Sequence, residues 1–253
     1  TLAGWVKNQR TSESVAVLGD LTGDGVPEFI SYASTDDTHG SMVGAAYVVD
    51  PETQTFSLLD MPVIASGSQI GWSASFLDLD GDGSEELYVG APQASHPDWG
   101  PMVGNIASYP PTETHWDTTA DQELWMPFVR SSGRFGYDVY SAGDFNNDGW
   151  EDLAVLGYTH RTNDLPGVVQ PSTCDYTAYG AIYIFLGNAA GLSNQPAFRI
   201  QPKRGFNYPR QIAGGMDVNN DGYDNFIFAN HTWNHNDGGV HLVLGRPHDG
   251  SSN

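Results

Sequence analysis

The chain has little positive charge and almost no cysteine. Lysine and arginine together number 10 among 253 residues, against 31 aspartate and glutamate residues, which gives a formal net charge of -21. So few cations exclude a protein that holds nucleic acid by charge, and they disfavour binding to anionic membrane surfaces. The one cysteine, Cys174, excludes an internal disulfide. We expect it to be a buried thiol or to pair with another chain.

Long apolar runs are also missing. No stretch is long enough to cross a bilayer as a helix and no signal peptide is recognisable, so direct membrane insertion is not expected. The acidity instead suits a saline medium, and we expect an extracellular or cell-surface location. Hydrophobic residues make up 39% of the chain, enough for a core, and 30 glycines and 15 prolines fit a fold with many turns.

A nine-residue pattern is present four times. Its clearest copy spans residues 144–152, with acidic or amide residues at positions one, three, five and nine and a glycine at position six. Alternate side chains of such a loop can point into one cavity, and the glycine permits the sharp turn that wraps an ion. The oxygen ligands predict Ca²⁺, up to four ions in all. The predicted ligands, with position seven contributing its backbone carbonyl, are Asp20, Thr22, Asp24, Val26 and Glu28; Asp78, Asp80, Asp82, Ser84 and Glu86; Asp144, Asn146, Asp148, Trp150 and Asp152; and Asp217, Asn219, Asp221, Tyr223 and Asn225.

These loops are not EF-hands. An EF-hand needs a bidentate glutamate at position twelve and helices on both sides. Position twelve holds Ser31, Val89, Val155 and Phe228 here. The run after each loop is short, apolar and rich in β-branched or aromatic residues, which is typical of a strand. Each loop is therefore predicted to join two strands, and its ion to stabilise the fold rather than to catalyse.

The four loops belong to a longer repeat. Their first aspartates are spaced by 58, 66 and 73 residues, and each repeat offers two strands around the loop, a third strand after a polar loop, and a weaker fourth. This order predicts an all-β propeller of four-stranded antiparallel blades, one domain over residues 1–253 with repeats beginning near 13, 71, 135 and 208. Residues 2–6 are expected to supply the outer strand of the last blade and so close a ring of four blades.

Two short signatures carry a family resemblance. The pair Phe135-Gly136, followed by the third loop, resembles the FG-GAP repeat of integrin α-subunit propellers, and Gly90-Ala91-Pro92 matches the second signature of that family. The resemblance covers essentially the whole chain, although the first and fourth repeats lack the Phe-Gly pair. Propellers of this family have about seven blades. The four repeats are therefore compatible with two architectures. One is a small four-bladed ring, and the other is part of a larger ring, for example one built from two copies.

Histidine is present in every loop between the second and third strands, at the end of the blades opposite the calcium loops. Converging imidazoles there can bind a transition metal or an anion, and the neighbouring tryptophans beside carboxylates suit a sugar or a peptide. The alternative is that these are ordinary loop residues and packing anchors. The residues of this candidate ligand face are His39, His96, Trp99, His160, His231, Trp233 and His235.

These patterns favour a calcium-binding extracellular recognition or adhesion module that binds a protein or a glycan through those loops. No nucleophile elbow, P-loop or zinc-protease helix is present, so an enzyme is not the expected class. Two alternatives remain open. One is a propeller hydrolase or lyase with its site at the central channel, and the other is a structural subunit of a larger surface assembly or a homodimer.

Overall fold

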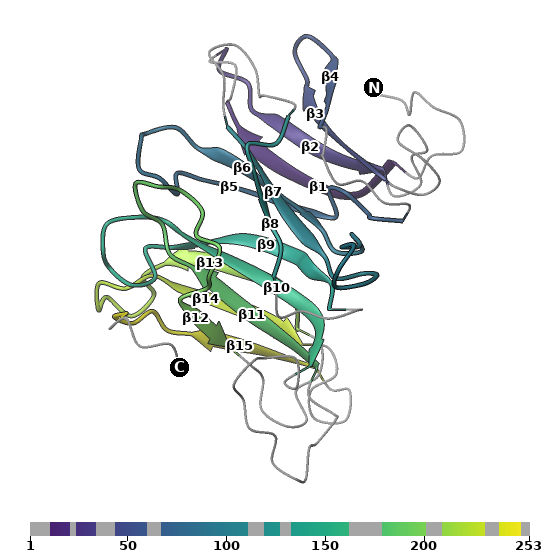
Figure 1. Ribbon diagram of the computed structural model, residues 1–253. Helices are drawn as coiled ribbons and strands as arrows, with labels where there is room; N and C mark the ends of the chain where they lie inside the picture. Colours follow the sequence, from purple (N-terminus) through teal and green to yellow (C-terminus); the bar gives the residue numbers. More distant parts are fainter. Residues whose placement is uncertain are drawn as a thin grey trace.

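The computed structural model describes residues 11–20, 24–33, 44–59, 67–110, 119–126, 133–161, 179–200, 209–230 and 238–248. In these ranges the chain forms strands and turns arranged as four antiparallel sheets, which follow one another from the N-terminal to the C-terminal end of the molecule (Figure 1). The predicted all-β propeller architecture with four-stranded blades is confirmed, with three strands of the last blade in the described part.

Each sheet is one blade and its strands pair in chain order. Blade 1 contains β1 (Thr11–Gly19), β2 (Glu28–Ala33), β3 (Ala45–Asp50) and β4 (Thr55–Leu58); blade 2 contains β5 (Ser73–Leu77), β6 (Glu86–Ala91), β7 (Asn105–Tyr109) and β8 (Gln122–Leu124); blade 3 contains β9 (Phe135–Gly143), β10 (Asp152–Arg161), β11 (Tyr179–Phe185) and β12 (Phe198–Ile200); and blade 4 contains β13 (Pro209–Met216), β14 (Asn225–Asn230) and β15 (Gly239–Val243).

The inner blades are apolar on both faces. In β10, Leu153 and Val155 point into the core shared with blade 2, whereas Ala154 and Leu156 point into the core shared with blade 4. Successive residues of a strand face opposite sides. A strand between two neighbouring blades therefore needs a continuous apolar run, which is the pattern that follows each loop. Three such cores join blade 1 to 2, 2 to 3 and 3 to 4.

The Phe-Gly and Gly-Ala-Pro signatures meet at one of these contacts. Phe135 is fully buried in the core between blades 2 and 3, and its N–H donates to the Val103 carbonyl at 2.9 Å. Gly136, at a φ of 78°, lies against Gly90, where an added Cβ would come within 2.2 Å of the Gly136 carbonyl oxygen. The two blades approach here backbone to backbone. Glycine is required on both sides of the contact because a side chain would hold the sheets apart.

Exposed apolar side chains are present at both ends of the row of blades. Val17 on β1 is 75% exposed and Leu242 on β15 is 53% exposed. Residues 2–6, predicted to complete the last blade, lie outside the described residues. Closure of a four-bladed ring therefore stays a prediction.

Candidate metal centre

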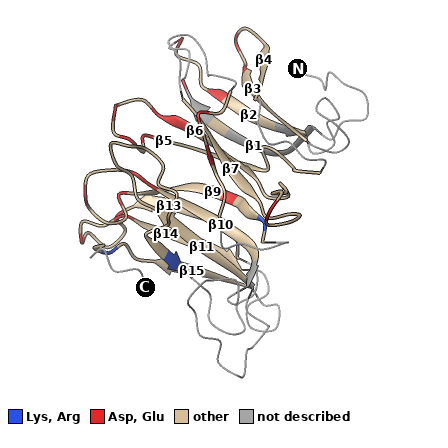
Figure 2. Cartoon of the chain, in the orientation of Figure 1, with Lys and Arg blue, Asp and Glu red and all other residues tan. Residues whose placement is uncertain are grey.

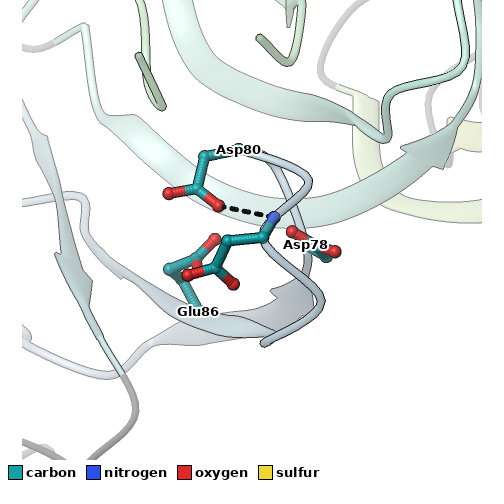
Figure 3. A group of neighbouring side chains, drawn as sticks. Asp78, Asp80 and Glu86 are labelled. Carbon is teal, nitrogen blue, oxygen red and sulfur yellow. Dashed lines mark hydrogen bonds between the residues drawn. The ribbon is translucent and has the colours of Figure 1, made fainter. Parts of the chain in front are cut away.

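The second loop, between β5 and β6, brings four carboxylates together. Carboxylate oxygens of Asp78, Asp80, Asp82 and Glu86 all lie within 4.8 Å of one another, and three of these residues are seen within one tight turn in Figure 3. Each oxygen belongs to a position that the nine-residue pattern assigns as a ligand. The grouping is the geometry that a hard cation with oxygen ligands requires.

A shared turn shapes all four loops. The first aspartate accepts a hydrogen bond from the N–H of the glycine at position six, at 2.7 Å in the Asp20 loop, 2.9 Å in the Asp78 loop and 2.8 Å in the Asp144 and Asp217 loops. Those glycines have φ between 88° and 93°, a conformation that an L side chain rarely adopts. The glycine therefore closes the loop, and the aspartate holds it closed.

The residue at position seven donates its N–H to the carboxylate at position five. The distance is 2.8 Å for Val26 and Ser84 and 3.1 Å for Trp150 and Tyr223. The predicted use of the position-seven carbonyl as a ligand stays a prediction. In the last loop the Asn225 amide donates to the Tyr223 carbonyl at 2.8 Å.

The protonation of the position-nine carboxylates depends on burial. Burial, with repulsion from Asp80, raises the pKa of Glu86 to about 7. Burial likewise raises the pKa of Asp152 to about 7, although its two oxygens accept hydrogen bonds from the N–H groups of Phe145 (2.9 Å) and Gly187 (3.0 Å). A divalent cation would supply the opposite charge that both carboxylates need in order to ionise.

Two buried ligand oxygens provide a separate test of the fit. Asp78 Oδ1 at position one of its loop and Asn225 Oδ1 at position nine of another are buried, and neither has a hydrogen-bond partner among the described residues. A buried acceptor without a donor costs about 1–3 kcal/mol. Coordination of a cation would satisfy both oxygens, so the residues present suit a metal ion.

The remaining loops differ from the second. In the third and fourth loops an amide replaces the carboxylate at position three, and Asn146 and Asn219 donate to Asp148 and Asp221 at 2.7 and 2.8 Å. In the first loop, Thr22 lies outside the described residues. There Asp24 and Glu28 group with Asp50, which ends β3. Sequence analysis missed Asp50 because the loop pattern spans only nine residues and Asp50 comes from the next strand.

Neighbouring loops are linked across blades. The carboxylate at position eight of one loop accepts a hydrogen bond from the first aspartate's N–H in the preceding loop, in the pairs Glu151–Asp78 (3.2 Å) and Asp224–Asp144 (2.9 Å). The Trp150 ring also lies over Gly81 of the preceding loop, where an added Cβ would be 2.4 Å from a ring carbon. The loops therefore form one acidic row along the ends of the blades (Figure 2).

At the opposite end of the blades, two residues of the candidate ligand face pack against each other. The His96 ring stacks on Trp99 at 3.9 Å and meets Trp125 edge-on at 5.1 Å, while Trp99 also packs against the core. In the described residues this pair therefore anchors its loop. The other five are not placed by the described residues: His160 lies on β10 with its side chain undescribed, and His39, His231, Trp233 and His235 lie outside the described residues. A shared histidine site stays a prediction.

A second feature of that end was not found from the sequence. Tyr137 stacks on Tyr158 at 4.3 Å, Arg134 and Arg210 lie over the Tyr158 ring at 5.9 and 5.1 Å, and Trp72 lies 5.4 Å from Tyr137. We call these five residues the Arg-Tyr cluster. They come from three blades, so no local pattern predicts it. Burial raises the pKa of the Tyr137 hydroxyl.

Comparison with known proteins places these features in a family. Residues 70–105 match the model of the FG-GAP repeat. The chain is 29% identical to integrin alpha-IIb of Mus musculus over 219 residues, which is 85% of this chain and 19% of that protein. It is 30% identical to integrin alpha-PS2 of Drosophila melanogaster over 171 residues, 62% of this chain and 11% of that protein. The chain is therefore similar to the FG-GAP repeats of integrin α-subunits over most of its length, and the resemblance predicted from the two signatures is confirmed.

Two further similarities either cover less of the chain or are weaker in sequence. A phosphatidylinositol-glycan-specific phospholipase D of Rattus norvegicus is 32% identical over 143 residues, 54% of this chain and 15% of that protein. Rhamnogalacturonan lyase YesW shares 14% identity and a TM-score of 0.48 over 89% of this chain and 42% of that chain, a likeness too weak to bear on chemistry. The chain spans between about a tenth and a fifth of the integrin relatives. Among the described residues there is no helix that could span a membrane.

Proposed function

We propose that the chain is a calcium-stabilised recognition module of the adhesion type, working outside the cell or at its surface. It binds up to four Ca²⁺ ions in the loops between the first and second strands. It contacts a protein or glycan partner at the opposite end of the blades. The observation that carries the proposal is the convergence of four carboxylates in the Asp78 loop, and the relation to integrin α-subunits supports it.

The role of the ion is to hold blades together. Without it the loops bring like charges close to one another, and the pKa of Glu86 near 7 reflects that repulsion together with burial. Binding to the folded state alone stabilises it by about 2.7 kcal/mol per site at a hundredfold excess over Kd. Because the loops contact one another through Glu151 and Trp150, each ion also stiffens the neighbouring blade's loop.

Calorimetric calcium titration and thermal melts test this role. Excess chelator should lower the melting temperature by many degrees relative to millimolar Ca²⁺. The number of charged ligands tunes calcium affinity. Asp82→Ala, in the loop with four carboxylates, should therefore remove the tightest binding step. Asp221→Ala, in the loop with the fewest carboxylates, should remove the weakest binding step. Asp98→Asn removes the charge of an exposed acid outside the loops and is the control. It should change neither the melting temperature nor the calcium-binding steps. Identical melts with chelator and calcium would contradict the proposal.

The recognition end is proposed from the Arg-Tyr cluster. Two of the 10 cationic side chains of this acidic protein meet there over stacked tyrosines. Arg210 is exposed and also donates from Nη1 to the Tyr137 hydroxyl at 3.4 Å. Guanidinium groups beside aromatic faces suit a partner that presents a carboxylate, either an acidic side chain of a protein or an acidic sugar.

Binding to immobilised acidic peptides and acidic glycans tests this end. Arg210→Gln should weaken binding about tenfold or more, by loss of one charge-assisted hydrogen bond worth about 1.5–3 kcal/mol. The matched control is Arg246→Gln, because Arg246 also lies over an aromatic ring, that of Phe198, at 5.0 Å but outside the cluster. Equal binding by both variants and the parent protein would place recognition elsewhere.

A further inference from the structure

A cavity opens between blades 3 and 4, at the end of the blades that carries the calcium loops. Its volume is about 400 Å³, within the range of small-molecule sites. Three segments that are far apart in the sequence line it. They are the third loop, through Asp148, the turn between β11 and β12, through residues 186–197, and the segment that follows β15, through His248. The cavity therefore lies at the opposite end from the Arg-Tyr cluster.

A backbone contact between blades brings the segment after β15 to this place. After the third strand of blades 3 and 4, the chain crosses the loop of the preceding blade. The Asn188 N–H donates to the Leu79 carbonyl at 3.0 Å, and the Arg246 N–H donates to the Phe145 carbonyl at 2.9 Å. Leu79 and Phe145 both occupy position two of their loops. The crossing is therefore a repeated feature of the fold.

The two crossings continue into different side chains. In blade 3 the chain continues to Leu192, which packs against the core shared with blade 2. In blade 4 it continues to His248, whose ring meets the Phe198 ring edge-on at 5.1 Å. An apolar contact in one crossing is thus a polar one in the other. The contact with Phe198 positions an imidazole in the wall of the cavity.

The turn between β11 and β12 is held by its own side chains, so this wall is formed before any ligand arrives. Asn188 Oδ1 accepts the Ala190 N–H at 3.0 Å, and its Nδ2 donates to the Gly191 carbonyl at 3.1 Å. Ser193 Oγ accepts the Gln195 N–H at 3.1 Å. These bonds leave the side-chain amide of Gln195, which is exposed and lines the cavity, for a ligand.

Hydrogen-bonding groups of both kinds lie beside an apolar patch. Pro196 and Ala197 contribute apolar surface, whereas Gln195, His248 and Asp148 contribute an amide, an imidazole and a carboxylate. A hydroxyl group both donates and accepts, so it can pair with any of these three groups. The lining therefore suits a ligand that carries several hydroxyl groups on an apolar carbon frame.

The charge of Asp148 is already shared within its own loop. Its two oxygens accept hydrogen bonds from the Trp150 N–H at 3.1 Å and from the Asn146 side-chain amide at 2.7 Å. Among the described residues that line the cavity there is no lysine or arginine. A charged ligand of either sign would lack a counter-ion there, and an unpaired charge is costly to desolvate. A neutral ligand is therefore favoured.

We propose that this cavity binds one ring of a neutral sugar. The ring carbons lie on Pro196 and Ala197, and the hydroxyl groups pair with Gln195, His248 and Asp148. The site is separate from the Arg-Tyr cluster and gives the molecule a second contact, at its calcium end. Asp148 also belongs to the third loop, so that part of the wall rests on the calcium binding proposed above.

Saturation-transfer NMR at constant calcium tests the proposal, with neutral hexoses, 6-deoxyhexoses and N-acetylhexosamines as probes at millimolar concentration. At least one sugar should receive saturation and shift the imidazole C–H signals of His248, which are identified by their absence in His248→Phe. Gln195→Ala should weaken binding of that sugar about threefold to tenfold, by loss of one hydrogen bond. The matched control is Asn194→Ala, which removes a neighbouring exposed amide outside the lining and should bind as the parent protein does.

Arg210→Gln separates this site from the recognition end and should leave the sugar affinity unchanged. Calcium-binding steps are measured without sugar, so failure of the sugar site would leave the calcium proposal standing. Three results would overturn the sugar site: no saturation of any sugar, a bound sugar that shifts no His248 signal, or binding that both Gln195→Ala and His248→Phe leave intact.

Discussion

Asp138 links two blades through a partly buried carboxyl group, and ionisation of this group lowers the free energy of unfolding by an amount that can be calculated. The Ile212 N–H on β13 donates to Asp138 Oδ2 on β9. Burial raises the pKa of Asp138 from 3.8 to about 7, and the backbone hydrogen bonds offset only part of this. The folded pKa therefore lies above the unfolded one. The free energy of unfolding therefore falls as the pH rises from about 4 to about 7. Below that window the carboxyl group is protonated in both states and the free energy of unfolding is not reduced.

Replacing this carboxyl with an amide should remove the cost. At 1.36 kcal/mol per pH unit, a shift of about 3 units corresponds to about 4 kcal/mol at full ionisation. Asp138→Asn keeps an oxygen for the Ile212 N–H. The variant should be more stable than the parent protein by about 2–4 kcal/mol at pH 8, and the gain should disappear at pH 4.

Urea unfolding at pH 4, 6 and 8 and at constant calcium measures this difference. The control is Asp98→Asn, which removes one exposed carboxylate and should show no such trend. A difference between Asp138→Asn and the parent protein that stays the same at all three pH values would refute the reasoning, because it would place the carboxyl in contact with solvent.

Two further predictions concern the contacts between loops. Glu151→Ala removes the acceptor of the Asp78 N–H and should cost about 1 kcal/mol of unfolding free energy in urea, with a weaker calcium site in the Asp78 loop; no change in either would mean that the loops act separately. Gly81→Ala should destabilise more than Gly83→Ala, by at least 1 kcal/mol, because both glycines have positive φ but only at Gly81 would the new methyl group meet a ring, that of Trp150. Equal costs for the two glycine variants would rule out that contact.

The sequence was informative wherever a feature is local. The strand order follows from apolar runs on either side of each loop, and the Asp78–Glu86 cluster follows from ligands that lie within a span of nine residues. Features that bring distant residues together could not be predicted in this way. Asp50 approaches Glu28 only because β2 and β3 pair, and the Arg-Tyr cluster exists only when three blades stack.

The role of Trp150 shows the same limit. The nine-residue pattern assigns a role only to its backbone carbonyl at position seven and does not indicate which surface its ring covers. That surface is Gly81 in the preceding loop, 69 residues earlier in the chain, where the absence of a side chain makes room for the ring. A glycine that the loop pattern treats as a spacer is therefore a contact point between blades.

The carboxylate hydrogen bonds between loops give the row of blades a polarity. In the two pairs that the described residues show, Glu151–Asp78 and Asp224–Asp144, the accepting carboxylate belongs to the later blade and the donating N–H to the earlier one, while the Asp224 N–H donates back to the Asp144 carbonyl oxygen at 3.0 Å. The two sides of a blade are therefore different, and the blades stack head-to-tail. An unequal contact of this kind produces a closed ring when its rotation closes and a fibre when it does not. The small angle between neighbouring blades thus decides between a finite ring and an endless row.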